Sequence, residues 1–132
     1  MPQIDVLKIA AVMCGAALGG AARYLFATAI TTMVGARFES RFPWGTFIVN
    51  MTGCFLIGLI ATFLVERVAS PLPWSLFLVT GILGGYTTFS AFGWETVQLT
   101  RQGEPWLAFA NVAGSTIFGY ASVWLGVLIA RK

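Results

Sequence analysis

The residue types best suited to chemistry lie in one short run, residues 84–92 with the sequence GGYTTFSAF, within an apolar segment. Glycine costs roughly 1 kcal/mol relative to alanine inside a helix, and threonine hydroxyls compete for backbone groups. Irregular backbone at membrane depth is tolerated only where protein buries it or where it lines a polar cavity. The run therefore predicts a membrane helix broken near its middle, beside an ion site.

Two phenylalanines, Phe89 and Phe92, follow the expected break and share one helix face. Phenylalanine in a membrane helix is usually a packing residue. The edge of an aromatic ring nevertheless carries partial positive charge, so ring edges that face a small anion attract it weakly. Weak attraction suits a site that must replace the water around an ion without binding the ion too tightly.

Polar side chains recur at helical spacing in two further apolar segments. Thr46 and Asn50 are four residues apart and share a helix face, as do Asn111 and Ser115. Such side chains commonly join membrane helices through hydrogen bonds. Two polar faces beside a helix break fit a polar track for an ion better than helix-to-helix bonding alone.

Two charged residues, Arg23 and Glu95, lie well inside apolar segments. A charge at that depth costs at least a few kcal/mol, so each is expected to face a partner or water. Arg23 either attracts an anion towards a vestibule or is structural, as a carbonyl anchor or in a salt bridge with Glu95. Glu95 is either that ionised partner or a proton relay.

The composition excludes several classes of protein. Hydrophobic residues make up 58% of the chain and charged residues 10%, against about 25% charged residues in soluble domains, so lipid is the expected solvent. The net charge of +3 comes from scattered residues rather than a basic stripe, which argues against nucleic acid as a partner. Histidine is absent, Cys14 and Cys54 are isolated packing residues by type, and no catalytic triad or carboxylate pair is present. We therefore expect no enzyme.

Four apolar stretches are long enough to cross a bilayer as helices. They cover residues 9–34, 44–68, 74–99 and 106–130, within a single domain that spans residues 1–132. Trp44, Trp74 and Trp106 each open a span, as an interfacial aromatic belt requires. The first stretch lacks the basic leader of a signal peptide, so we interpret it as a retained membrane helix.

The charges flanking the four spans are almost balanced. Both chain termini would lie on the side that carries Lys8, Arg67, Arg131 and Lys132, opposite Arg37, Arg41 and Arg101. Such a small difference allows either a single weakly biased orientation or insertion in both orientations with antiparallel self-pairing. Small residues at helix-packing spacing (Gly15 with Gly19, Gly81 with Gly85, Ser115 with Gly119) predict close helix association, within one chain or between two.

These residues together resemble the small bacterial fluoride channels, the Fluc or CrcB family. The resemblance extends over nearly the whole chain, through residues 15–23, 44–50, 80–95 and 114–115. The glycine-threonine-phenylalanine run is its most specific part. The resemblance implies a multi-pass protein of the bacterial inner membrane: an antiparallel, dual-topology homodimer of four-helix chains with two fluoride pores and a central structural sodium ion.

The resemblance also implies roles for single residues. Backbone carbonyls of Gly84 and Thr87 from both subunits would hold Na⁺, and Arg23 matches a first-span arginine of the vestibule or the structure. The pore residues implied by position or by a shared helix face are Phe89, Phe92, Asn50, Thr46, Ser90, Asn111 and Ser115. The chain departs from the family pattern at Ala91, Gly93 and Gly119, where hydroxyl residues are common, so the details of the polar track differ.

The function expected from this resemblance is passive, fluoride-selective export from the cytoplasm, which lowers fluoride toxicity. The main alternative is a small multidrug-type, proton-coupled exporter, which shares the four-span dimeric architecture but relies on an acidic residue in the first span. Here that span holds Arg23 and no acid. Transport coupled to protons through Glu95, or a purely structural subunit of a larger complex, are further alternatives.

Overall fold

The protein is an all-α bundle in the computed structural model, which describes residues 5–37, 40–68 and 72–132. Its elements, with η for π-helix, are α1 (Val6–Gly35), α2 (Trp44–Phe63), η1 (Leu64–Val68), α3 (Leu72–Ser75), η2 (Leu76–Leu83), α4 (Gly84–Tyr86), α5 (Phe89–Arg101) and α6 (Pro105–Ala130). Within the described residues, four segments are long and apolar enough to span a membrane: Val6–Gly35, Trp44–Glu66, Leu76–Arg101 and Pro105–Ala130. The prediction of an all-α protein with four membrane-length helices is confirmed.

Helix α1 begins earlier than the predicted boundary at residue 9. Asp5 caps it, because an Asp5 side-chain oxygen accepts a hydrogen bond from the backbone nitrogen of Leu7 at 3.0 Å. Helix α6 begins with Pro105 in its first turn, where a missing backbone N–H costs nothing.

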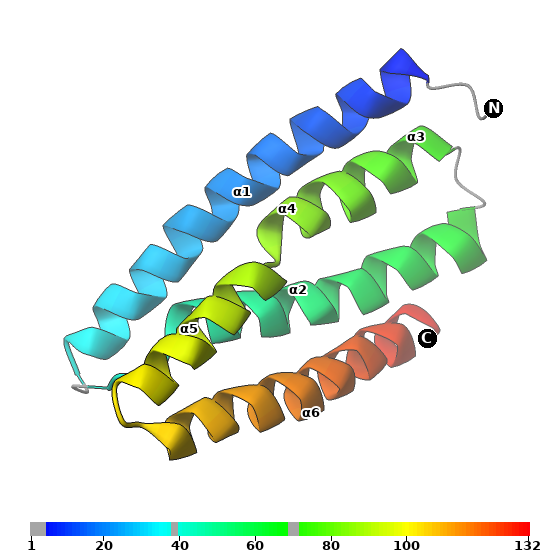
Figure 1. The fold of residues 1–132 in the computed structure, drawn as a ribbon. Helices are drawn as coiled ribbons and strands as arrows, with labels where there is room; N and C mark the ends of the chain where they lie inside the picture. The colour runs from blue at the N-terminus through cyan, green and yellow to red at the C-terminus, as the bar shows by residue number, and fades with distance from the viewer. Residues whose placement is uncertain (1–4, 38–39, 69–71) are drawn as a thin grey trace.

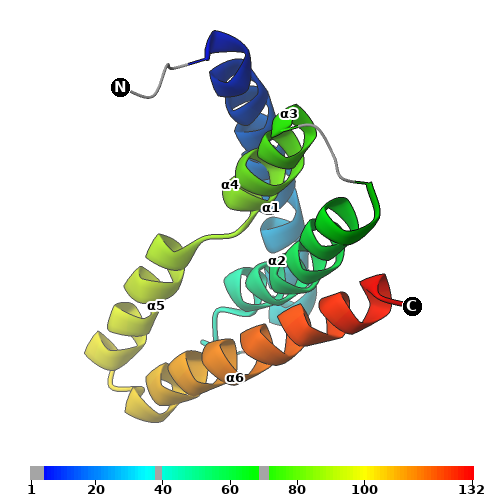
Figure 2. The same cartoon turned by 90° about the vertical axis from the view of Figure 1, so that its right-hand side faces the viewer.

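The third span changes neighbours along its length. Its first part, η2 and α4, packs against α1, whereas its second part, α5, packs against α6. Figures 1 and 2 show this change as a bend between α4 and α5. The start of α1 and the end of α6 lie towards the same end of the bundle (Figure 1). A chain with an even number of spans must have this arrangement.

Close contact between α1 and the first part of the third span depends on small residues. A Cβ atom added to Gly81 would lie 2.9 Å from Gly15 Cα, and one added to Gly85 would lie 2.6 Å from the Ala16 carbonyl oxygen. A Cβ added to Gly19 would overlap the Ile82 carbonyl oxygen. These glycines therefore serve helix packing within one chain, one of the two uses expected from their spacing.

Helices α2 and α6 make the most extensive pairing in the bundle. A Cβ added to Gly58 would overlap the Val123 carbonyl oxygen, so the two backbones approach closely there. Ion pairs join the elements at both ends: Arg41 Nη1 lies 2.9 Å from Glu104 Oε1, and Arg131 Nη2 lies 3.0 Å from Glu66 Oε1. The side chain of Arg67 lies outside the described set. Of this pair, α6 is the main neighbour of the second part of the third span, whereas α1 is the main neighbour of the first part.

Candidate functional site

The centre of the site is the non-helical pair Thr87 and Thr88. Thr87 has φ −82° and ψ 157°, and Thr88 has φ −149° and ψ 115°, both extended. Thr88 also caps α5, because its hydroxyl oxygen accepts a hydrogen bond from the Ala91 backbone nitrogen at 3.2 Å. The glycine-threonine run therefore contains two extended residues between α4 and α5, at the depth of the membrane-length helices.

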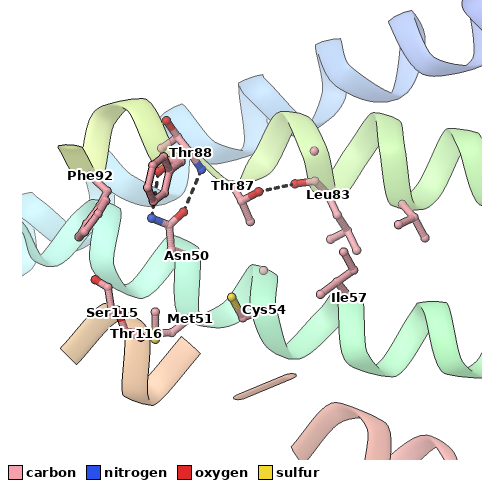
Figure 3. A pocket seen from close by; sticks show the side chains of 14 residues that line it. Asn50, Met51, Cys54, Ile57, Leu83, Thr87, Thr88, Phe92, Ser115 and Thr116 are labelled. Atoms are coloured by element: carbon pink, nitrogen blue, oxygen red, sulfur yellow. Dashed lines mark hydrogen bonds between the residues drawn. The ribbon is translucent and has the colours of Figure 1, made fainter. Parts of the chain in front are cut away.

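Asn50 of α2 binds both backbone polar groups of Thr88 (Figure 3). The Thr88 backbone N–H donates to Asn50 Oδ1 at 2.9 Å, and Asn50 Nδ2 donates to the Thr88 carbonyl oxygen at 3.1 Å. In a continuous helix the Thr88 N–H would instead donate to the carbonyl oxygen of Gly84. The Asn50 amide thus takes the place of a helical partner and leaves the Gly84 carbonyl without that bond.

Arg23 lies beside the same break. Its Nη1 atom donates a long hydrogen bond of 3.5 Å to the Thr87 carbonyl oxygen. Among the described residues the ion pairs are Asp5–Lys8, Arg41–Glu104 and Glu66–Arg131, so Arg23 and Glu95 form none. The suggested Arg23–Glu95 salt bridge is wrong, because Arg23 reaches the break whereas Glu95 lies two helical turns further along the third span. The contact of Arg23 with the Thr87 carbonyl instead matches the other structural alternative, in which Arg23 is anchored to a backbone carbonyl.

A cavity of about 400 Å³ opens beside the break, between the third span and helices α2 and α6 (Figure 3). It brings together six residues singled out in the sequence: Asn50, Gly84, Thr87, Phe89, Phe92 and Ser115. The rings of Phe89 and Phe92 are tilted by 38° with centroids 5.4 Å apart. Phe89 is 85% exposed, so most of its ring is free for an ion, lipid or a second chain.

A second cavity, of about 460 Å³, lies on the other side of Thr88. Its lining includes Arg23, Thr46, Thr88 and Ser90. Thr88 lines both cavities. Its hydroxyl lies 3.3 Å from that of Ser90, which lines the second cavity.

Glu95 takes its hydrogen bond from α2 rather than from a basic group. Thr46 Oγ1 donates to Glu95 Oε1 at 2.6 Å. The other carboxylate oxygen, Oε2, is buried without a hydrogen-bond partner in the described structure. Burying a carboxylate oxygen without a partner costs free energy of folding. The stability of the protein should therefore be sensitive to substitutions at Thr46 and Glu95.

Asn111 and Ser115 occupy different surroundings although they share a face of α6. Asn111 is only 1% exposed, and its Nδ2 donates to Thr96 Oγ1 of α5 at 2.9 Å. Ser115 lines the 400 Å³ cavity, with its hydroxyl 3.5 Å from Asn111 Oδ1. Asn111 therefore joins α6 to α5, while Ser115 presents a hydroxyl towards open space.

Sequence reasoning missed three contributors from α2: Cys54, Thr52 and Gly53. Cys54, interpreted as packing, lines the 400 Å³ cavity one turn after Asn50, and that four-residue spacing was the available signal. The Thr52 and Tyr86 hydroxyl oxygens are 2.9 Å apart. A Cβ added to Gly53 would overlap the Thr87 side-chain methyl group. No spacing rule links Thr52 or Gly53 to the third span.

Main-chain carbonyls are the cation ligands that this region offers. In the part of the chain with described coordinates, no cluster of three or more Cys, Asp or Glu side chains could hold a metal ion. The helical donor to Gly84 is diverted to Asn50, and the helical donor to Thr87, the Ala91 N–H, is diverted to the Thr88 hydroxyl. The Gly84 carbonyl therefore lacks its helical donor, and the Thr87 carbonyl has the long contact with Arg23 in place of its helical donor. Carbonyl oxygens at a helix break are the type of ligand that a hard cation such as Na⁺ prefers.

Comparison with known proteins identifies the family of this chain. A family model described as "CrcB-like protein, Camphor Resistance (CrcB)" matches residues 10–127. The chain belongs to this family. The resemblance stated from the sequence is therefore confirmed, and the chain is a multi-pass membrane protein.

Individual relatives in the CrcB family match along nearly their whole length. A Solibacter usitatus protein named fluoride-specific ion channel FluC is 52% identical over 126 residues, which cover 96% of this chain and 100% of the relative. FluC 2 of Bradyrhizobium diazoefficiens is 46% identical over 125 residues, covering 92% and 88%. FluC of Hydrogenovibrio crunogenus is 37% identical over 132 residues, covering 100% and 97%. Each of these matches is long enough to include both the helix break and its polar neighbours.

Proposed function

We propose that this chain is a fluoride-selective channel that lets fluoride leave the cytoplasm passively across the bacterial inner membrane. Whole-length similarity to proteins named fluoride-specific ion channels carries the proposal. The geometry supports it, because Thr88, inside a membrane-length segment, lines two mostly apolar cavities that carry a few polar groups. Irregular backbone at that depth is expected where it lines a pathway.

The proposed path begins at the cavity that contains Arg23, whose positive charge raises the local concentration of anions. It continues past the Thr88 and Ser90 hydroxyls to the 400 Å³ cavity with Asn50 and the two phenylalanines. The Thr88 and Ser90 hydroxyls share one hydrogen bond, which uses the O–H of one of them, so the O–H of the other remains available to donate. Asn50 uses one of its two amide N–H groups on Thr88 and retains the second.

Selectivity follows from few donors in a mostly apolar space. Fluoride is smaller than chloride and accepts stronger hydrogen bonds, so it gains more from one amide N–H, a few hydroxyls and the positive edges of two rings. Chloride would lose its hydration without equal compensation. Since the donors are few, fluoride is not held so tightly that it fails to leave.

The direction of net flow follows from the membrane potential. Fluoride enters from acidic surroundings as neutral HF and ionises in the cytoplasm. An interior-negative potential then drives the anion outwards with about 2.3 kcal/mol per charge for each 100 mV. Neither ATP nor a coupled ion gradient is needed.

A second copy of the chain, inserted in the opposite orientation, completes the proposed channel. The 85% exposure of Phe89 supports this arrangement, because a lone chain leaves that ring outside the protein. The near balance of positive charge at the two membrane faces is compatible with insertion both ways. Carbonyl oxygens of Gly84 and Thr87 from both copies would hold one structural Na⁺, which supplies positive potential and joins the two breaks when bound.

Fluoride efflux from liposomes tests the proposal directly. Purified protein is reconstituted in vesicles loaded with potassium fluoride or potassium chloride, and valinomycin is added to release the potassium. We expect fast fluoride efflux, with chloride retained, measured by ion-selective electrodes. Fluoride retention by vesicles that contain correctly folded protein would refute the proposed function.

The same assay separates a channel from a proton-coupled exporter that uses Glu95. We expect fluoride flux to continue when the proton gradient is collapsed, in the wild type and in Glu95→Gln. Flux that requires a proton gradient and disappears in Glu95→Gln would favour the coupled exporter. Sedimentation of the detergent-solubilised protein in NaCl and in choline chloride tests the dimer and its dependence on Na⁺.

A further inference from the structure

We propose that Asn50 is a positioning residue for the third span: its side-chain amide is a latch that keeps Thr87 and Thr88 extended. The sequence and the family resemblance assign Asn50 to the pore as a donor to the ion. The geometry points to an additional role on the protein backbone itself. The expected effect of Asn50 on Na⁺ binding rests on the proposed function, whereas its effect on the backbone of Thr87 and Thr88 does not.

The latch consists of two hydrogen bonds of opposite polarity to a single residue. Oδ1 of Asn50 accepts from the Thr88 N–H at 2.9 Å, and Nδ2 donates to the Thr88 carbonyl at 3.1 Å (Figure 3). An amide side chain can do this because it carries a donor and an acceptor side by side, like a peptide group. The pairing imitates that between neighbouring strands, in which one residue exchanges both bonds with its partner.

Two neighbours of Asn50 on α2 hold the two residues that precede Thr88. The hydroxyls of Thr52 and Tyr86 are 2.9 Å apart, and Thr52 already donates to the Ile48 carbonyl, so Tyr86 is the donor of that bond. Gly53 leaves the space that the Thr87 methyl group occupies. Helix α2 thus contacts three consecutive residues of the third span, which makes the Asn50 contact part of a fitted interface.

The latch competes with a continuous helix. Without Asn50, the Thr88 N–H would lose its partner at membrane depth, where an unsatisfied group is costly. The nearest replacement is the carbonyl oxygen of Gly84, the normal partner four residues back in an α-helix. That bond would turn Thr87 and Thr88 towards helical angles and occupy the Gly84 carbonyl. Asn50 therefore decides whether the third span is broken and whether that carbonyl is free for a cation.

The conformation of the break is the first readout. Backbone ¹³Cα and ¹³Cβ chemical shifts of Thr87 and Thr88 are measured by NMR in Na⁺-containing micelles for the wild type, Asn50→Ala and Asn111→Ala. Asn111 is a matched control, because its amide also joins the third span to a neighbour, through Thr96, but lies away from the break. We expect extended shifts in the wild type and Asn111→Ala, and loss of the extended shifts in Asn50→Ala. Unchanged shifts in Asn50→Ala would overturn the proposal.

Sodium dependence is the second readout and needs no transport. The Na⁺ concentration that gives half-maximal thermal stabilisation should rise at least about tenfold in Asn50→Ala and stay within about twofold in Asn111→Ala. If Asn50→Ala does not fold, the wild-type chemical shifts of Thr87 and Thr88 provide the test. Helical shifts at Thr87 and Thr88 in the wild type would refute the latch without any variant.

The two proposals fail separately. Extended shifts that depend on Asn50, in a protein that does not conduct fluoride, would support the latch and refute the channel. If the protein conducts fluoride, and Asn50→Ala changes neither the chemical shifts of Thr87 and Thr88 nor the Na⁺ dependence of thermal stability, the channel would be supported and the latch refuted.

Discussion

The guanidinium group of Arg23 and the carbonyl group of Thr87 are in contact across the bundle, with Nη1 3.5 Å from the oxygen. Thr87 O is also one of the two carbonyls proposed to hold Na⁺. A fixed positive charge therefore lies next to a proposed cation ligand and, at the same time, lines the cavity through which an anion would enter. This double position makes Arg23 informative about both ions.

We predict that Arg23→Gln has opposite effects on the two ions. The affinity for Na⁺ should rise roughly three- to tenfold, because a like charge beside the site is removed. Fluoride flux at low fluoride concentration should fall, because the charge that concentrates the anion is lost. Na⁺-dependent melting and the concentration dependence of fluoride efflux measure the two effects. Arg23→Lys, which keeps the charge, is the control, and an unchanged Na⁺ affinity in Arg23→Gln would contradict the prediction.

Replacing both Phe89 and Phe92 with isoleucine should abolish fluoride flux while the protein remains dimeric. Isoleucine retains apolar bulk but has no ring edge that attracts an anion. Fluoride efflux from liposomes and sedimentation of the purified variant provide the measurements. Phe109→Ile is the matched control, since Phe109 is also exposed but lies on α6, away from the lining of the 400 Å³ cavity. Undiminished flux in the double variant would remove both rings from the mechanism.

Thr46→Val should destabilise the protein more than Glu95→Gln does. Removal of the Thr46 hydroxyl leaves both oxygens of Glu95 without a partner, because Oε2 already has none, and should cost about 1–3 kcal/mol. Glutamine keeps the accepting oxygen and replaces the unsatisfied carboxylate oxygen with a neutral group, which is cheaper to bury. Thermal unfolding in detergent compares the two variants. The reverse order of stability would show that the Thr46–Glu95 contact is not formed as described.

Adjacent glycines in α1 provide a sharp test of the packing. Gly19→Ala should strongly impair folding, because its Cβ would overlap the Ile82 carbonyl oxygen, a backbone atom that cannot rotate away. Gly20→Ala meets nothing within 4 Å in the chain and should be neutral or stabilising by up to about 1 kcal/mol through helix propensity. Yield and melting temperature of the purified variants are the measurements. Equal tolerance at both positions would contradict the close approach of α1 to the third span.

Local patterns were sufficient for the outline of the fold. Apolar runs of membrane length predicted four spans, because the thickness of the bilayer fixes how many consecutive apolar residues a helix needs. The four-residue spacing of Thr46 and Asn50 placed both on one face of α2, and both bond to the third span. The glycine-threonine run marked where Thr87 and Thr88 are extended. These features depend on composition and periodicity within a few turns, which can be read directly from the chain.

Only the tertiary structure decided which partner each polar group takes. Glu95 bonds to Thr46 rather than to Arg23, and Arg23 reaches the Thr87 carbonyl. The amide of Asn50 binds the backbone of Thr88. These pairs are 38 to 64 residues apart in sequence, and they meet because glycines on α1 and α2 let the third span approach to a particular depth and register. A buried polar group takes whichever partner that packing brings within hydrogen-bond distance, and helical spacing alone carries no information about it.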